Sequence, residues 1–103
     1  MRSVTARYRF DAEVWTSETT ATWHFVSVPE EDADDIDERF GHRAAGFGSI
    51  RVEVTIGSST WQTSVFPDNK RATYVLPVKA AVRKAERLAL GSVARVELRV
   101  LPI

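Results

Sequence analysis

The sequence predicts a mainly β domain in which six strands and two short helices form a small barrel. Apolar and polar residues alternate with a period of two in several segments, which is typical of strands with one buried face. The two helical patterns are short, and no regular succession of strands and long helices indicates a parallel sheet. At 103 residues, of which 44% are apolar, the chain has the length of one domain with a single core.

The first predicted strand covers residues 4–14, where apolar side chains occupy every second position. A polar stretch over residues 16–20 predicts a turn, and a second strand follows over 21–28 with Trp23 and Phe25 on one face. We expect these two strands to pair with each other as an antiparallel hairpin.

A helix is predicted over residues 29–40 and a loop over 42–48. Pro29 is followed by three acidic residues, which suit the positive end of a helix dipole. Apolar side chains then recur at helical spacing, at Ala33, Ile36 and Phe40. Gly41 is predicted to end the helix.

The second half of the chain predicts four more strands and one more helix. The strands are expected over residues 50–56, 61–66, 72–76 and 94–100, and the helix over 78–90. Gly57-Ser58-Ser59 and Pro67-Asp68-Asn69-Lys70 are turn signals between strands. Pro77 is predicted to open the helix and Gly91 to end it.

The two halves repeat one order of elements: a strand, a helix opened by proline, a glycine and an alternating strand. Pro29 and Pro77 stand at equivalent places, 48 residues apart. Neither half is long enough to bury a core alone. The repeat therefore predicts a pseudo-twofold barrel made by one chain.

Three segments resemble a known family: Gly46-Phe47-Gly48, residues 61–67, and residues 74–85 followed by Gly91. Together they resemble the bacterial domain of unknown function DUF1905. The resemblance implies a double-split β-barrel, the architecture of AbrB-type swapped-hairpin DNA-binding dimers. Ser92 stands where the family usually has an acidic residue. The resemblance implies no activity, since the family's function is not established.

Composition excludes several kinds of chemistry. The chain has no cysteine, which excludes disulfides, thiolate nucleophiles and iron–sulfur clusters. Neither His24 nor His42 has a second histidine at metal-binding spacing, and we interpret both as structural or surface residues. Ser64 has no nucleophile-elbow glycines. With no secretory signal and no apolar stretch of membrane-spanning length, we expect a cytoplasmic, non-enzymatic protein without a cofactor or metal.

The net charge of zero is the sum of two oppositely charged segments. Residues 30–38 hold seven of the fourteen acidic residues, an acidic run that is either a solvated face or a docking face for a basic partner. From Lys70 to the end there are eight basic and two acidic residues. The basic side chains of the second helix form either a plain exposed face or an anion site. Opposite charges also allow weak pairing between copies, so we expect a monomer or a weak homodimer.

The leading hypothesis is a binding barrel with a cleft between the barrel and the basic helix. Its candidate ligand-binding residues combine aromatic walls with cationic or hydroxyl groups. They are Arg43, Trp61, Ser64, Phe66, Lys79 and Arg83. The expected partner is an anionic small molecule or a protein, and not a membrane. Binding of DNA is the less favoured alternative, because the acidic run repels phosphate.

Overall fold

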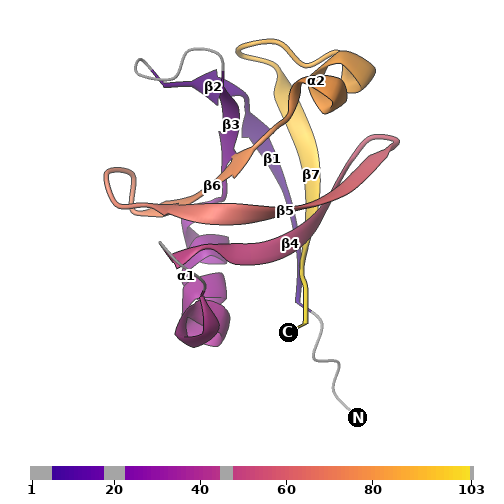
Figure 1. Ribbon diagram of the computed structural model, residues 1–103. Coiled ribbons are helices and arrows are strands. Elements are labelled where there is room, and N and C mark those ends of the chain that lie inside the picture. The colour runs from indigo at the N-terminus through magenta and orange to yellow at the C-terminus, as the bar shows by residue number, and fades with distance from the viewer. Residues whose placement is uncertain (1–5, 18–22, 45–47, 103) are drawn as a thin grey trace.

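Seven strands form one antiparallel sheet that curls into a half-barrel, with a helix near each end (Figure 1). This computed structural model describes residues 6–17, 23–44 and 48–102. The strands are β1 (Arg7–Glu13), β2 (Trp15–Thr16), β3 (His24–Ser27), β4 (Ile50–Ile56), β5 (Ser59–Asp68), β6 (Thr73–Pro77) and β7 (Val93–Val100). The helices are α1 (Glu30–Phe40), the short 3-10 helix η1 (Gly41–Arg43) and α2 (Ala80–Glu86). The predicted mainly β class with two helices is confirmed.

The curl of the sheet depends on β5, which belongs to two ladders. Its first part pairs with β4, from Ile56↔Ser59 to Ile50↔Val65. Its last three residues pair with β6, from Phe66↔Val75 to Asp68↔Thr73. The strand order is β1-β7-β4-β5-β6-β3-β2, and its two outermost strands follow each other directly in the chain. One strand thus joins the two halves of the sheet and lets it bend round a single core.

The core is formed by the inner faces of the strands, as the alternation predicts. Along β4 and β7 every second side chain is buried, and the residues between them are exposed or half-buried. The largest fully buried side chains of the sheet include Val26, Val52, Val54, Val65, Leu76, Val96 and Leu98. No charged side chain is buried among the described residues.

The predicted hairpin between the first two strands is confirmed only next to its turn, where a short strand after Val14 pairs with β3. Strand β1 pairs with β7 along its whole length, and only β2 pairs with β3. The cause is Val14, which is buried and held by two backbone bonds. Its N–H donates to the Ser92 carbonyl, and its carbonyl accepts the N–H of Gly91, both at 2.9 Å. The chain therefore divides at Val14 into two strands, which adds a seventh strand to the predicted six.

Helix α1 matches its prediction except at its end. Pro29 is the N-cap, and the expected apolar side chains Ala33, Ile36 and Phe40 are buried. Gly41 was expected to end the helix, but it has a right-handed φ of −58°, and the chain continues into η1. The turn of the chain comes only at Ala44, which is extended. The predicted loop over 42–48 thus begins with a 3-10 turn, and residues 45–47 lie outside the described part.

Helix α2 is much shorter than the predicted 78–90. It starts late because Pro77 still pairs with Phe25 in the sheet, and the N–H of Val78 donates to the His24 carbonyl at 2.8 Å. It ends early because Arg87 is left-handed, with φ 56°, and the Leu88 N–H donates to the Arg83 carbonyl at 2.8 Å. Gly91 therefore does not end this helix. None of the described helices is long and apolar enough to cross a membrane.

Candidate functional site

A groove of about 510 Å³ lies between β5, β3 and the junction of β6 with α2. Its aromatic lining residues are Trp23, Trp61 and Phe66. Its charged or titratable lining residues are His24, Lys79 and Arg83. We call this feature the α2 groove. Its size falls within the range of about 300–1,000 Å³ that is typical of small-molecule sites.

The α2 groove exists because two neighbouring strands separate. The ladder between β5 and β6 stops at Phe66↔Val75. Beyond that point β5 stays with β4, whereas β6 pairs with β3 through Leu76 and Pro77. Along residues 59–65, β5 therefore has no described strand on the side away from β4. The lining side chains surround the space that this separation leaves.

Glu86 helps to hold α2 in its position beside the groove. Its carboxylate accepts hydrogen bonds from the hydroxyls of Ser59 at 2.6 Å and Ser58 at 3.1 Å. The bond from Ser59, with that from Ser58, holds the pKa of Glu86 below its ordinary value. Gly57 leaves room for this carboxylate, since a Cβ there would lie 2.0 Å from Glu86 Oε1. The helix is thus tied to the turn between β4 and β5.

The cations of the groove are not neutralised by acidic residues. Arg83 is partly buried, and its Nε donates to the Val78 carbonyl at 3.1 Å. Its terminal nitrogens have no partner among the described residues, and Lys79 makes no ion pair there either. Six arginines elsewhere do form ion pairs: Arg7, Arg9, Arg39, Arg71, Arg95 and Arg99. The α2 groove thus contains two cations that have no acidic partner among the described residues.

Four of the six sequence-predicted site residues line this groove: Trp61, Phe66, Lys79 and Arg83. Ser64 does not, because its hydroxyl faces β4, where it accepts a hydrogen bond from Arg51 Nη1 at 3.4 Å. Arg43 has its backbone in η1, directly after α1, and its side chain lies outside the described part. The structure thus brings together the predicted aromatic walls and the two cations of the second helix region.

His24 and Trp23 are groove residues that the sequence reasoning did not select. The inward-facing positions of β3 are His24 and Val26, so the imidazole sits on an otherwise apolar face. Its Nδ1 is buried and has no hydrogen-bond partner, the one such side-chain atom in the described residues. In the sequence, His24 is two residues before Val26 and therefore lies on the same face of the strand as this buried valine. This spacing is the feature from which its position could have been predicted.

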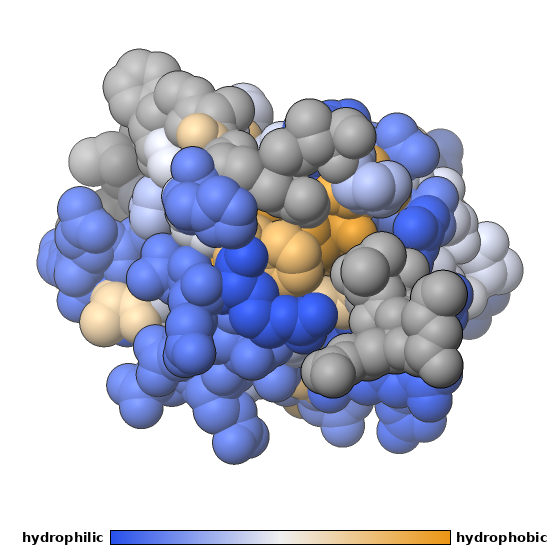
Figure 2. Space-filling model, turned by 90° about the horizontal axis from the view of Figure 1, so that it is seen from below, coloured by the Kyte–Doolittle hydropathy of each residue, from blue (hydrophilic) through white to orange (hydrophobic). Residues whose placement is uncertain are grey.

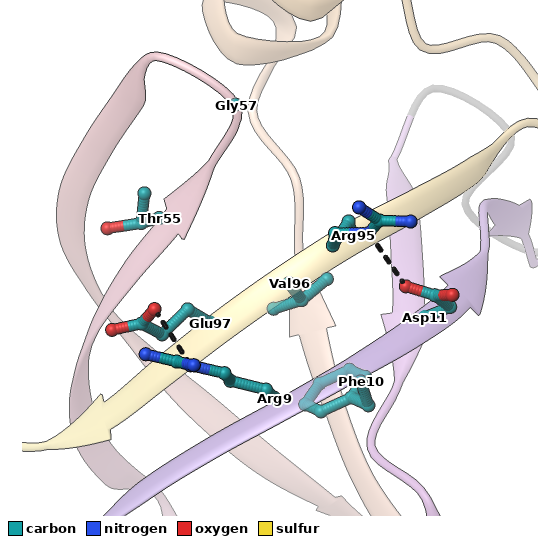
Figure 3. Close-up of a pocket in the computed structure, with 8 residues that line it drawn as sticks. All are labelled: Arg9, Phe10, Asp11, Thr55, Gly57, Arg95, Val96 and Glu97. Atoms are coloured by element: carbon teal, nitrogen blue, oxygen red, sulfur yellow. Dashed lines mark ion pairs between the residues drawn. The ribbon is translucent and has the colours of Figure 1, made fainter.

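A larger hollow, of about 650 Å³, lies on the outer face of β1, β7 and β4 (Figure 3). Its charged side chains are already matched across the strands. Arg9 pairs with Glu97 at 3.2 Å, and Arg95 pairs with Asp11 at 3.5 Å (Figure 3). Both arginine side chains are more than three-quarters exposed. A ligand here would compete with internal partners and water, so the α2 groove is the better candidate.

Acidic side chains form no metal site in the described residues, where no three histidine, aspartate or glutamate groups converge. The acidic run of α1 is instead crowded. Partial burial raises the pKa of Asp32, and the nearby Glu31 and Asp35 raise it further. The run is tied to the sheet by Tyr8, whose hydroxyl donates to Asp35 at 2.6 Å. This geometry indicates a packed helix with a charged outer face.

The fold and the groove together define a small, mainly β protein with an aromatic-walled cationic groove. The chain belongs to DUF1905, a domain of unknown function, because the model of that family matches residues 10–98. The matched region contains every lining residue of the α2 groove. No curated protein matches this chain.

Proposed function

We propose that this protein is a non-enzymatic, cytoplasmic binding module whose α2 groove takes an anionic small molecule. One observation carries the proposal: Lys79 and Arg83 have no acidic partner in the described residues, and they share a groove with three aromatic side chains. An anion bound there would gain two charge partners without breaking an existing ion pair. The aromatic walls would cover its apolar part.

Arg83 is the residue on which the proposal depends most. Its bond from Nε to the Val78 carbonyl holds the guanidinium in place before a ligand arrives. Less side-chain freedom is then lost on binding, and the terminal nitrogens are available for a carboxylate or phosphate. Lys79 is exposed and adds a more flexible charge.

The described groove residues offer hydrogen-bond donors and cations, and they form no set of nucleophile, base and orienting group. Thr63 lines the groove, but no hydrogen bond links it to His24. The groove chemistry therefore favours binding over catalysis, and the proposal assigns no reaction.

A matched pair of variants tests this function. Arg83→Ala removes a cation inside the groove, and Lys84→Ala removes a cation from the same helix outside its lining. A thermal-shift panel of aliphatic carboxylates, aromatic carboxylates, sugar phosphates and mononucleotides identifies stabilising anions. Titration calorimetry should then show a loss of about tenfold or more in affinity for Arg83→Ala and less than about twofold for Lys84→Ala. A panel without any stabilising anion, or equal losses in both variants, would overturn the proposal.

Weak DNA binding by an AbrB-like double-split barrel with a pseudo-twofold repeat is the alternative. It is supported by four cations that lie within nine residues, Lys79, Arg83, Lys84 and Arg87. The acidic run of α1 opposes it, because the equivalent helix of the other half would repel phosphate. In an anisotropy titration with duplex DNA at low salt, this alternative predicts that Lys84→Ala and Arg83→Ala weaken binding equally. If the protein instead binds a small anion in the α2 groove, the two variants need not affect DNA binding equally.

A further inference from the structure

We infer that His24 donates a hydrogen bond from Nε2 to the bound ligand, and that this ligand is an aromatic ring carrying an oxyanion. The inference rests on the proposed function, since it concerns the same groove. It names the chemical class of ligand and adds a binding residue on the wall opposite α2.

His24 is held firmly at the groove. It begins β3, pairs with Thr16, and its carbonyl accepts the N–H of Val78 at 2.8 Å. The imidazole lines the α2 groove, with Nδ1 turned into the protein and buried without a partner. The other ring nitrogen, Nε2, is not among the buried, unpartnered atoms of the described residues. Because the His24 side chain also makes no hydrogen bond within the described residues, Nε2 is not enclosed and is the nitrogen that a ligand can reach.

The buried Nδ1 also decides which nitrogen carries the proton in the neutral ring. A proton on Nδ1 would be a buried donor without an acceptor, which is the costlier kind of unsatisfied group. The tautomer with the proton on Nε2 leaves only a lone pair unsatisfied. In this tautomer His24 presents the N–H of Nε2 to the groove, and its natural partner is an oxygen of the ligand.

The aromatic part of the ligand follows from the exposed side chains. Four large hydrophobic residues are exposed in the described chain, and the two aromatic ones, Trp23 at 57% and Phe66 at 40%, both line this groove. Trp23 already stacks on Phe25, with 6.3 Å between ring centroids, yet stays more than half exposed. A planar ring would cover this remaining apolar surface and gain offset stacking.

The charge of the ligand follows from Arg83 and Lys79, which face the same space from the α2 side. An oxyanion that reached both walls would accept from Arg83 on one side and from His24 Nε2 on the other. A planar body between Trp23 and Phe66 with a carboxylate, sulfonate or phosphate at its edge would accept hydrogen bonds from Arg83 and from Nε2 of His24 at once.

The ligand class is tested with three small probes on the full chain: 2-naphthoate, the neutral 2-naphthamide and the non-aromatic cyclohexanecarboxylate. Quenching of tryptophan fluorescence reports binding near Trp23 and Trp61, and calorimetry gives the affinities. We expect 2-naphthoate to bind about tenfold or more tightly than either control, because each control lacks one of the two features. Equal affinity for 2-naphthoate and 2-naphthamide would overturn the oxyanion part, and equal affinity for cyclohexanecarboxylate would overturn the aromatic part.

The role of His24 is tested by His24→Phe and His24→Gln. The phenylalanine variant keeps a flat side chain without the donor and should bind 2-naphthoate about three- to tenfold more weakly. The glutamine amide can take the place of Nε2, and this variant should stay within about threefold of the wild type. Without ligand, His24→Phe should melt at a higher temperature, because the buried unpartnered nitrogen is gone. A histidine with only a structural role would instead lower the melting temperature when replaced.

The outcomes separate the two claims. If 2-naphthoate binding is lost in Arg83→Ala and kept in His24→Phe, the inference about His24 is wrong and the proposed function stands. If the wild type binds none of the probes and no anion of the wider panel, the proposed function is wrong, and the inference falls with it. Should His24→Phe not fold, as judged by circular dichroism, His24→Val carries the same expectations for affinity.

Discussion

Helices α1 and α2 lie at opposite ends of the molecule (Figure 1), and they are held there by different interactions. Helix α1 has eleven residues and buries Ala33, Ile36 and Phe40 against the sheet. Helix α2 has seven residues and buries only Val82. Helix α2 is held mainly by hydrogen bonds instead. Ser58 and Ser59 donate to Glu86, and Arg83 donates to the Val78 carbonyl.

The surfaces at the two ends differ as well. The end that carries α1 is mainly hydrophilic, with an apolar strip near its centre (Figure 2), and the acidic side chains of α1 belong to it. The α2 end combines unpaired cations with exposed aromatic side chains. Helix α1, which buries the most apolar side chains, therefore contributes mainly to the stability of the fold. The helix held by polar contacts forms a wall of the groove in which we propose that the ligand binds.

Removal of buried side chains should affect the two ends very unequally. Ile36 is fully buried, so Ile36→Ala should lower the free energy of unfolding by about 3–4 kcal/mol through lost apolar burial and a cavity. Val82→Ala removes fewer atoms from a shorter helix and should cost about 2 kcal/mol. Urea denaturation followed by circular dichroism measures both values.

Native-state hydrogen exchange tests the same contrast without relying on cavity sizes. Amides of α1 should exchange only on global unfolding, whereas those of α2 should exchange through a lower-energy local opening. Equal exchange free energies in the two helices, or a larger cost for Val82→Ala than for Ile36→Ala, would contradict the proposed division of roles.

A smaller effect is expected for the polar contacts of α1. Tyr8 is buried and donates to Asp35 at 2.6 Å, and burial followed by this bond raises its pKa. Tyr8→Phe should cost about 1 kcal/mol, because the carboxylate that loses the bond stays accessible to water. Tyr74 donates to Asp37 at a longer 3.3 Å, so Tyr74→Phe is the matched control with a smaller expected cost. Urea denaturation of both variants decides the order, and a larger cost for Tyr74→Phe would reverse it.

Much of the fold was predictable because burial alternates along each strand. The spacing of apolar residues alone predicts that Val52, Val54 and Leu98 are buried, and it predicts the same for Ile36 in α1. The partner of a strand is not encoded in that spacing. The pairing of β1 with β7 joins residues that are 80 to 92 positions apart and depends on the bonds of Val14 to the α2–β7 turn. Local pattern reasoning favoured the nearer strand instead.

The site was predictable in part for a related reason. Trp61, Phe66, Lys79 and Arg83 were selected by residue type, and the separation of β5 from β6 brings them to one groove. The same selection included Ser64, which the register turns toward Arg51. The end of α2 was missed because Arg87, and not a glycine, adopts the left-handed conformation. His24 could not be predicted as a site residue, because the missing partner of an isolated histidine is visible only in three dimensions.

The smallest predicted effect concerns the polar tie of α2 and its dependence on pH. Hydrogen bonds from Ser59 and Ser58 hold the pKa of Glu86 below its ordinary value of 4.5. The ionised carboxylate therefore stabilises the folded protein above about pH 4.5, and this contribution is lost as the pH falls through the lowered pKa. Glu86→Gln should lower the melting temperature slightly at pH 7 and by less at pH 3, because the amide keeps weaker acceptor bonds at both values.

The matched control is Glu13→Gln, which neutralises an exposed glutamate of β1 whose carboxylate has no hydrogen bond or ion pair in the described part of the chain. The difference in melting temperature between Glu13→Gln and the wild type should be the same at pH 7 and at pH 3. The corresponding difference for Glu86→Gln should be smaller at pH 3 than at pH 7. A constant difference for Glu86→Gln across this range would show that the serine bonds do not stabilise the charged form. The position of α2 would then have to depend on Val82 and Arg83 alone, and the contrast between an apolar and a polar end would lose its main support.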